Sequence, residues 1–383
     1  MREAVIVEGV RTPVGRKNGL LKDIRADDLA AESLKALVDR AGINPEIIDD
    51  VILGCVSQIG EQTGDIARVA ALIAGFPIEV PGTTIDRQCG SSQQAVHFAA
   101  QAILAGDMDI VIAGGVESMS RVPIGTSYQG VGFSKKLTAR HEIIHQGLSA
   151  ERIAEKYGFT REELDKYSYE SHQKALKAQA GGHFEQEIAP LAITLPDGMT
   201  ITVTEDSGPR KNTSVEALGS LRTVFKEDGV IHAGNSSQIS DGAAALLIMS
   251  REKAEELGIK PRFRIIARSV VGSDPTLMLT GPIPATKKVL KKAGLSIEEI
   301  DVFEVNEAFA PVPLAWLKET GADPSKLNPN GGAIALGHPL GGSGARLMVT
   351  MMHELERTGG RFGLQTMCEG HGMANATIIE RLD

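Results

Sequence analysis

Cys89 is the residue of this sequence that is best placed to act as a nucleophile. It lies in residues 85–94, between a short predicted strand and an amphipathic predicted helix. A cysteine at a helix N-terminus feels the positive end of the helix dipole, which favours the thiolate over the thiol. The polar Ser-Ser-Gln-Gln run that follows is a poor setting for a cysteine of the core. A lone cysteine is more often inert, but this position favours a nucleophile.

His338 is a candidate general base in a glycine-rich segment, residues 328–344. A glycine-rich loop before a helix can also hold a phosphate. This loop lacks the Gly-Lys-Ser/Thr ending of a P-loop and the spacing of a dinucleotide fingerprint. Because Gly337 and Pro339 hold the histidine in a stiff turn of small residues, we favour a base beside a thiol.

Two further segments follow predicted strands and carry polar or reactive groups. Residues 366–373 contain Cys368, and the glycines after it, including Gly370, would expose backbone amides that suit an oxyanion. A buried, inert residue is the commoner fate of a free cysteine such as Cys368. Asn306 and Glu307 end another predicted strand, and open α/β folds place their sites at such strand ends.

An internal repeat relates these segments to one another. Identical residues recur at an offset of 252, namely Gly42 with Gly294, Asp49 with Asp301, and Glu117 with Glu369, and the same offset places the turn of Cys89 opposite the turn that begins at Gly341. Each copy alternates predicted strands with helices, which implies parallel sheets covered by helices on both faces. We therefore expect two copies of one βα module, at about residues 1–120 and 253–383.

The stretch between the copies, about residues 120–250, is expected to be an excursion from the first copy. It contains predicted helices at residues 149–157 and 162–180. Its last apolar run, Ala243–Met249, is expected to rejoin the first sheet. An independent third domain is the alternative interpretation.

Composition predicts a cytoplasmic enzyme with no nucleic-acid, membrane or metal partner. The chain has 383 residues, 42% hydrophobic and 23% charged, and a formal net charge of −9. Its first ten residues do not resemble a signal peptide, and no apolar run reaches the roughly 20 residues of a membrane span. Three scattered cysteines, Cys55, Cys89 and Cys368, are too few for a disulfide framework or a zinc site.

The sequence resembles the thiolase family over essentially its whole length. The resemblance is carried by four signature blocks in the family's order, which contain Cys89, Asn306-Glu307-Ala308-Phe309, Gly337-His338-Pro339 and Cys368-Glu369-Gly370. It implies a thiolase-like α/β fold of two duplicated βα domains, whose parallel-rich sheets are covered by helices, plus an inserted loop domain. The implied boundaries are 1–118 with 239–261 for the N-terminal domain, 119–238 for the loop domain and 262–383 for the C-terminal domain.

The family resemblance implies cleavage of 3-ketoacyl-CoA by coenzyme A, or condensation of two acetyl-CoA to acetoacetyl-CoA. Cys89 would hold the acyl group covalently, and His338 would keep its thiol ionised and polarise a thioester oxygen. Cys368 would act as the second acid or base. One oxyanion cradle would use His338 with a water held by Asn306, and the other the backbone N–H groups of Cys89 and Gly370.

The resemblance also implies that coenzyme A is a substrate and that no cofactor or metal is bound. Arg210 and Ser237 match positions of the family that bind coenzyme A, and His145 and Phe309 match positions beside the pantetheine arm. Thiolases form homodimers or homotetramers. The segment from about 121 to 140 is expected to contain the contact that distinguishes the two states.

Two departures leave the preferred acyl chain open. His371 interrupts the glycine run of the last signature block, and Gln146 stands where short-chain members often carry methionine. Both positions are expected near the acyl end of the site.

Two other classes of protein remain open from the sequence. A non-catalytic acyl-CoA or sterol carrier on the same scaffold would be favoured by loss of Cys89, His338 or Cys368, and all three are present. A decarboxylating ketoacyl synthase pairs one cysteine with two histidines, or with a histidine and an asparagine, and lacks a second catalytic cysteine. The presence of Cys368 argues against it.

Overall fold

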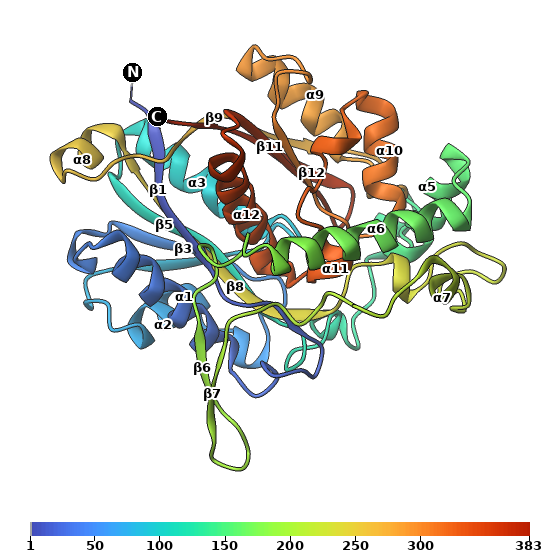
Figure 1. Ribbon diagram of the computed structural model, residues 1–383, viewed down its shortest axis with the longest axis horizontal. Coiled ribbons are helices and arrows are strands. Elements are labelled where there is room, and N and C mark those ends of the chain that lie inside the picture. The colour runs from blue at the N-terminus through green and yellow to red at the C-terminus, as the bar shows by residue number, and fades with distance from the viewer. Residues whose placement is uncertain (1) are drawn as a thin grey trace.

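Across residues 2–383, which the computed structural model describes, ten strands form one mixed sheet (Figure 1). Its strands are β1 (Ala4–Arg11), β2 (Gly15–Arg16), β3 (Asp50–Gly54), β4 (Gly82–Ile85), β5 (Ile110–Ser118), β8 (Ser240–Ser250), β9 (Phe263–Gly272), β10 (Val302–Val305), β11 (Phe362–Glu369) and β12 (Met373–Arg381). They lie in the order β10-β11-β12-β9-β1-β8-β5-β3-β4, with β2 paired to β8. A separate hairpin consists of β6 (Leu191–Thr194) and β7 (Thr200–Val203).

Helices cover both faces of this sheet, and further helices lie in the excursion between β5 and β8. They are α1 (Ala26–Ala41), α2 (Ile66–Ile73), α3 (Ser91–Ala105), α4 (Lys135–Thr138), α5 (Gln146–Tyr157), α6 (Arg161–Ala180), α7 (Val215–Gly219), α8 (Arg251–Glu256), α9 (Pro282–Ala293), α10 (Pro311–Thr320), α11 (Ala333–Leu336) and α12 (Ser343–Thr358). None of the helices within residues 2–383 is long and apolar enough to cross a membrane.

The structure confirms the repeat of the sequence. β3, α3 and β5 begin 252 residues before β10, α12 and β11, respectively. The repeat extends to side chains. The Oδ2 atom of Asp49 accepts hydrogen bonds from the backbone N–H of Asp109 at 2.7 Å and Ile110 at 2.8 Å. The equivalent atom of Asp301 accepts from Arg361 at 2.7 Å and Phe362 at 3.0 Å, so both copies start this strand in the same way.

The two copies bury their apolar faces against a shared layer of two helices, α3 and α12 (Figure 1). Successive residues of β1 point to opposite faces, as they must in a strand. Ile6 packs with Ala99 of α3 and Met348 of α12, whereas Val5 packs on the other side with α1 and α2. In the second copy, α9 and α10 cover the outer face. The two halves of the one sheet therefore lie on either side of the central helices, and the order of layers is helix, first half of the sheet, helix, second half of the sheet, helix.

The α/β fold class is confirmed, but the sheet is mixed rather than parallel-rich. Three pairs are parallel, namely β3 with β4, β3 with β5, and β10 with β11. The other ladders of the sheet are antiparallel. The short turn of residues 370–372 joins β11 to β12, and a connection of that length allows only an antiparallel pair.

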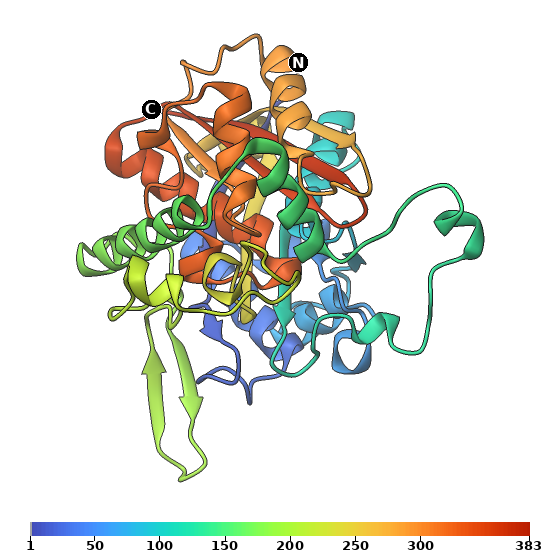
Figure 2. The same ribbon diagram turned by 90° about the vertical axis from the view of Figure 1, so that its right-hand side faces the viewer.

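The chain between β5 and β8 leaves the first copy and returns to it. β8 pairs with β5 on one side and β1 on the other, which confirms the strand expected at residues 243–249. The excursion includes an extended loop before α5 that projects from the body (Figure 2). The β6–β7 hairpin also projects (Figure 2). The domain boundaries at residues 118, 238 and 261 stay predictions.

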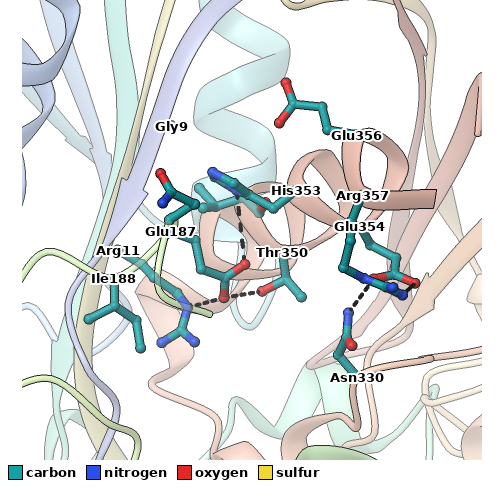
Figure 3. A network of polar contacts seen from close by, with 12 residues as sticks. Gly9, Arg11, Glu187, Ile188, Asn330, Thr350, His353, Glu354, Glu356 and Arg357 are labelled. Carbon is teal, nitrogen blue, oxygen red and sulfur yellow. Dashed lines mark hydrogen bonds and ion pairs between the residues drawn. The ribbon is translucent and has the colours of Figure 1, made fainter. Parts of the chain in front are cut away.

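A buried ionic network ties the excursion to the core (Figure 3). The guanidinium of Arg11 on β1 is fully buried, with Nε 2.5 Å from Oε1 of Glu187. Two more of its nitrogens lie 2.7 and 2.8 Å from the carboxylate oxygens of Asp206. Thr350 of α12 donates to the same oxygen of Glu187 at 3.0 Å. This cluster therefore joins β1, the excursion and the central helix α12.

Replacement of Arg11 by methionine should lower the free energy of unfolding by about 3–5 kcal/mol, because two buried carboxylates lose their cation. Urea unfolding followed by circular dichroism measures this. Arg361→Met is the matched control, since Arg361 pairs with Glu380 but is 67% exposed, and should cost less than about 1 kcal/mol. Equal losses in both variants would show that the network does not stabilise the fold.

Candidate active site

His338 lies in the turn between α11 and α12, and its ring is held from both sides. Nδ1 is 2.6 Å from Oγ of Ser343, and that hydroxyl donates to the backbone oxygen of Pro339 at 2.8 Å. The hydroxyl has only one hydrogen, which it donates to Pro339, so it must accept the hydrogen bond from His338. Nδ1 therefore carries the ring proton. The lone pair of Nε2 then faces Nδ2 of Asn306, 3.4 Å away.

The imidazole of His338 is neutral in this environment. Burial lowers its pKa to about 3, and the positive charge of Arg346 on α12 acts in the same direction. A neutral ring with a free Nε2 lone pair can accept a proton from a thiol. After accepting it, Nε2–H becomes a donor that can stabilise an oxyanion.

Asn306 is placed by the first residues after β10. Its backbone N–H donates to the oxygen of Thr366 on the neighbouring strand at 3.1 Å. The side chain is 1% exposed, and Oδ1 has no hydrogen-bond partner among residues 2–383. An unsatisfied buried oxygen beside the imidazole of His338 is suited to accept a hydrogen bond from a ligand group or a water.

Glu307 orients the glycine-rich loop rather than facing the reacting groups. Its Oε2 accepts from Ser171 at 2.7 Å and from the backbone N–H of Ile334 at 3.0 Å. Its Oε1 accepts from Tyr167 at 2.9 Å. The carboxylate thus fastens the segment before His338 to helix α6.

Glu117 fastens the other end of this loop to the first copy. Its carboxylate accepts from the backbone N–H of Gly341 at 2.9 Å. It also accepts from the N–H groups of Val56 at 2.9 Å and Ser57 at 3.0 Å. A β-carbon at Gly341 would lie 2.7 Å from Cα of Cys55, so only glycine permits this close contact.

Cys89 lies in the turn before α3 and is 6% exposed. The turn is fixed by Gln88, whose φ of 49° is left-handed and whose N–H donates to Asp86 at 2.6 Å. Leu340, two residues after His338, belongs to the apolar cluster around Cys89. The turn of one copy therefore meets the turn of the other, as the repeat led us to expect.

The expectation of a resting thiolate at Cys89 is wrong for this structure. Burial raises the pKa of Cys89 to about 12, and the nearby carboxyl of Glu369 adds to the rise. Cys89 is therefore a thiol at neutral pH, and it needs a base when it attacks.

Cys368 is the last but one residue of β11 and is also a buried thiol. Burial raises its pKa, and the charge of Cys89 raises it further, because the two cysteines lie near each other. Phe309 and Ile334 belong to the apolar cluster that contains Cys368. Gly370 follows in the same turn, and a β-carbon there would lie 2.8 Å from Oε1 of Gln88. Gly370 thus contacts the Cys89 turn.

Three of the four residues expected to bind coenzyme A lie in or beside a row of three aromatic rings, those of His145, Phe225 and Phe309. His145 begins α5 and stacks on Phe225 with ring centres 5.0 Å apart. Phe225 meets Phe309 edge to face at 6.0 Å. The N–H of Ser237 donates to the oxygen of Ala308, next to Phe309, at 3.0 Å. The row leads from α5 to the apolar cluster of Cys368.

Arg210, the fourth of these residues, lies beside α6 rather than in the aromatic row. Its backbone N–H donates to Nδ1 of His172 on α6 at 3.2 Å. Gln238 links the backbone of Gly208 to that of Ile334 and so holds the Arg210 segment against the loop before His338.

His371, the departure from the family's glycine run, contacts the projecting excursion. Its ring meets Phe133 edge to face at 5.7 Å, and Nε2 is 3.4 Å from the hydroxyl of Tyr128. Within residues 2–383, no cluster of three His, Cys, Asp or Glu has the geometry of a metal site.

Sequence reasoning missed two residues that shape the site. Ser343 positions the His338 ring, and its place five residues later in the same glycine-rich turn was the available signal. Phe225 bridges His145 and Phe309, but it lies in an irregular segment without periodicity, so no local pattern marks it.

A duplicated α/β fold that brings thiols, a neutral histidine and an asparagine to the same turns holds the groups that acyl transfer through a cysteine requires. Residues 4–252 match the thiolase N-terminal domain and residues 259–381 match the thiolase C-terminal domain. The chain therefore belongs to the thiolase family.

Known relatives agree over the full length of the chain. The chain is 50% identical to a steroid 3-ketoacyl-CoA thiolase of Mycobacterium tuberculosis, covering 100% of this chain and 95% of that protein. It is 45% identical to a β-ketoadipyl-CoA thiolase of Acinetobacter baylyi, with both chains fully covered. The crystal structure of an acetyl-CoA acetyltransferase of Bacillus anthracis superposes with a TM-score of 0.92, at 40% identity, covering 100% of this chain and 99% of that one.

Replacement of Ser343 by alanine should reduce kcat by about 10- to 100-fold, because a hydrogen bond to an ionising group contributes about 1.5–3 kcal/mol. Steady-state cleavage of acetoacetyl-CoA measures it. Ser269→Ala is the control, since that buried hydroxyl donates to the oxygen of Ala285 on another layer. An unchanged kcat in Ser343→Ala would show that the bond does not position His338.

The low pKa of His338 predicts how the rate of Cys89 acylation depends on pH on the acid side. A base is active when unprotonated, and a pKa of about 3 keeps His338 neutral at all pH values above 5. The rate of Cys89 acylation should therefore show no acid limb near pH 6.5, the ordinary histidine value. Rapid-quench mass spectrometry between pH 5 and pH 7.5 measures this. A limb near pH 6.5 that disappears in His338→Asn would contradict the prediction.

Proposed function

We propose that this enzyme cleaves 3-ketoacyl-CoA with coenzyme A, or runs the reverse condensation of two acetyl-CoA, through an acyl group on Cys89. The hydrogen-bond chain from Ser343 through His338 to Asn306 carries the proposal, because it puts the ring proton on Nδ1 and leaves Nε2 unprotonated, so that Nε2 can act as a base. The buried thiols of Cys89 and Cys368 supply the nucleophile and the second acid or base.

In the cleavage direction, Nε2 of His338 takes the proton of Cys89 as its sulfur attacks the 3-keto carbonyl. The developing oxyanion is then stabilised by a backbone N–H or by the new Nε2–H. The bond between Cα and Cβ breaks, and Cys368 gives its proton to the departing enolate of acetyl-CoA. Cys368 next takes the proton of the incoming coenzyme A thiol, which attacks the acyl-Cys89. His338 returns its proton to Cys89.

The two oxyanion cradles are assigned as the resemblance implies. His338 with a water on Asn306 forms one, and the N–H groups of Cys89 and Gly370 form the other. The unpartnered Oδ1 of Asn306 and the contact of Gly370 with the Cys89 turn support these assignments. Desolvation strengthens both cradles, because hydrogen bonds are stronger in a low dielectric.

The inserted segment is proposed to bind coenzyme A and to make contacts between copies of the chain. Arg210, Ser237 and His145 come from it, with Phe309 beside them. The projecting loop exposes apolar side chains, including Val131 at 69% and Phe133 at 46%. These support a homodimer or homotetramer, although the number of copies and a cytoplasmic location stay predictions.

The substrate is proposed to be a 3-ketoacyl-CoA of the fatty-acid type. Relatives are named for steroid, β-ketoadipyl and 3-ketoacyl substrates. The ratio of cleavage rates for acetoacetyl-CoA and 3-ketooctanoyl-CoA sets the chain-length class. A carrier would cleave neither, and a decarboxylating synthase would release carbon dioxide.

The separate roles of the two cysteines predict different products in their alanine variants. Cys368→Ala incubated with acetyl-CoA should retain an acetyl adduct on Cys89, while turnover falls by about 10²- to 10⁴-fold. Cys89→Ala should form no adduct and should not turn over. Intact-mass spectrometry and cleavage assays measure both.

Cys55→Ala is the control for these variants, because it removes the third thiol without a proposed chemical role, and it should keep the adduct. An adduct that persists in Cys89→Ala would overturn the assignment of the nucleophile.

A further inference from the structure

Glu369 is a fully buried carboxyl directly behind the Cys89 turn. It ends β11, one residue after Cys368. Its Oε1 fills the space where a side chain of Gly90 would stand, only 2.1 Å from the position of a β-carbon there. Gly90 follows Cys89 and begins α3. The carboxyl thus lies against the residue that follows the nucleophile.

The carboxyl of Glu369 has no hydrogen-bond partner on either oxygen within residues 2–383. The nearby amide of Asn375 on β12 donates to the backbone oxygen of Gly90 at 3.1 Å instead. A buried carboxylate without donors is costly, so its neutral form is favoured. Burial accordingly raises the pKa of Glu369 to about 8, with Arg87 lowering it and Asp86 raising it.

The internal repeat supplies a comparison within the same chain. Glu117 is the residue equivalent to Glu369 in the first copy, and it faces Gly341, which is equivalent to Cys89. Each carboxyl therefore lies against the turn that begins the central helix of the other copy. Gln62 and three backbone N–H groups donate to Glu117, which therefore anchors its turn. The same position in the second copy keeps its carboxyl but none of these donors.

We propose that Glu369 is a positioning residue that controls the charge beside Cys89. As a neutral acid it permits the Cys89 thiolate to form, and as a carboxylate it opposes the thiolate by repulsion. The proposal rests on the proposed role of Cys89 as the nucleophile. The reactivity of Cys89 should therefore stop rising with pH where Glu369 ionises. The cause of this upper limit is the protein's own carboxyl rather than ionisation of the coenzyme A thiol.

The charged and titrating groups around Glu369 are few. Arg87, Asp86 and Cys89 face it from the turn before α3, and Cys368 and His371 flank it on its own segment. On β12, Met373 pairs with Glu369, and Asn375 lies beside the same Gly90; both are uncharged. Nη1 of Arg87 lies 3.8 Å from the sulfur of Met373 and does not pair with Glu369. Of the two carboxyl groups beside Cys89 in this set, Glu369 is the buried one and Asp86 the exposed one.

The test is the rate at which iodoacetamide alkylates Cys89 in the full-length enzyme, read by peptide mass spectrometry from pH 6.5 to pH 10. Below pH 7.5, wild type and Glu369→Gln should react at nearly equal rates, because the carboxyl is mostly protonated in wild type and the glutamine carries no charge. Above pH 8, wild type should fall behind the variant. At pH 9.5 the variant should react roughly tenfold faster, which corresponds to a difference of one unit in the pKa of Cys89.

Glu369→Met is a second variant that removes both the charge and the hydrogen-bonding atoms, and it should give the same divergence above pH 8. Asp86→Asn is the matched control, since the exposed Asp86 has the weaker effect on Cys89, and it should change the profile less. Coincident profiles of wild type and both Glu369 variants, or a change of equal size at every pH, would overturn the proposal.

Failure of the proposed function gives a different result. In that case Cys89→Ala would still turn over the substrate, whatever the alkylation profile of Cys89 shows.

Discussion

The close approach of α3 and α12 at their first turns is the constraint on which the rest of the structure depends. A β-carbon at Gly344 would lie 2.4 Å from the backbone nitrogen of Gln93, so the two helices touch backbone to backbone. Ser92 adds a hydrogen bond to the N–H of Ala345 at 2.9 Å. Each helix is preceded by the turn that carries a reactive residue, Cys89 in one copy and His338 in the other. The sheets, the outer helices and the carboxylates hold this contact in place.

Burial at the contact decides how the site works. Both cysteines are thiols and the histidine is a neutral base, so charge appears only when a proton moves between them. Hydrogen bonds therefore position the ring of His338 before any ion pair exists. A dry site of this kind strengthens every donor that faces a developing oxyanion, and it raises the cost of any carboxylate left nearby.

Much of this arrangement could be predicted from the sequence, because the repeat and the signature segments are local patterns. The offset of 252 residues places β10, α12 and β11 without error, and the strand near residues 243–249 follows from its apolar run. The pairing of β1 with β9 and the antiparallel return of β12 depend on contacts far apart in the chain, so they were not evident. The state of Cys89 was misjudged for a related reason. A helix dipole can be recognised from neighbouring residues, but burial depends on the whole fold.

The pairing of β1 with β9, through Val5 with Arg264 and Ile6 with Phe263, has a consequence for the origin of the chain. β1 and β9 hold the same place in the two copies, because the order β1-β8-β5-β3 recurs as β9-β12-β11-β10, and the equivalent helices α3 and α12 also touch each other. A single ancestral copy would meet itself through the same surfaces as a symmetric dimer, with identical turns on both sides. Within one chain the two turns can differ, and here one carries the thiol of Cys89 and the other the imidazole of His338. A symmetric dimer of one copy would have to carry the same residues in both turns.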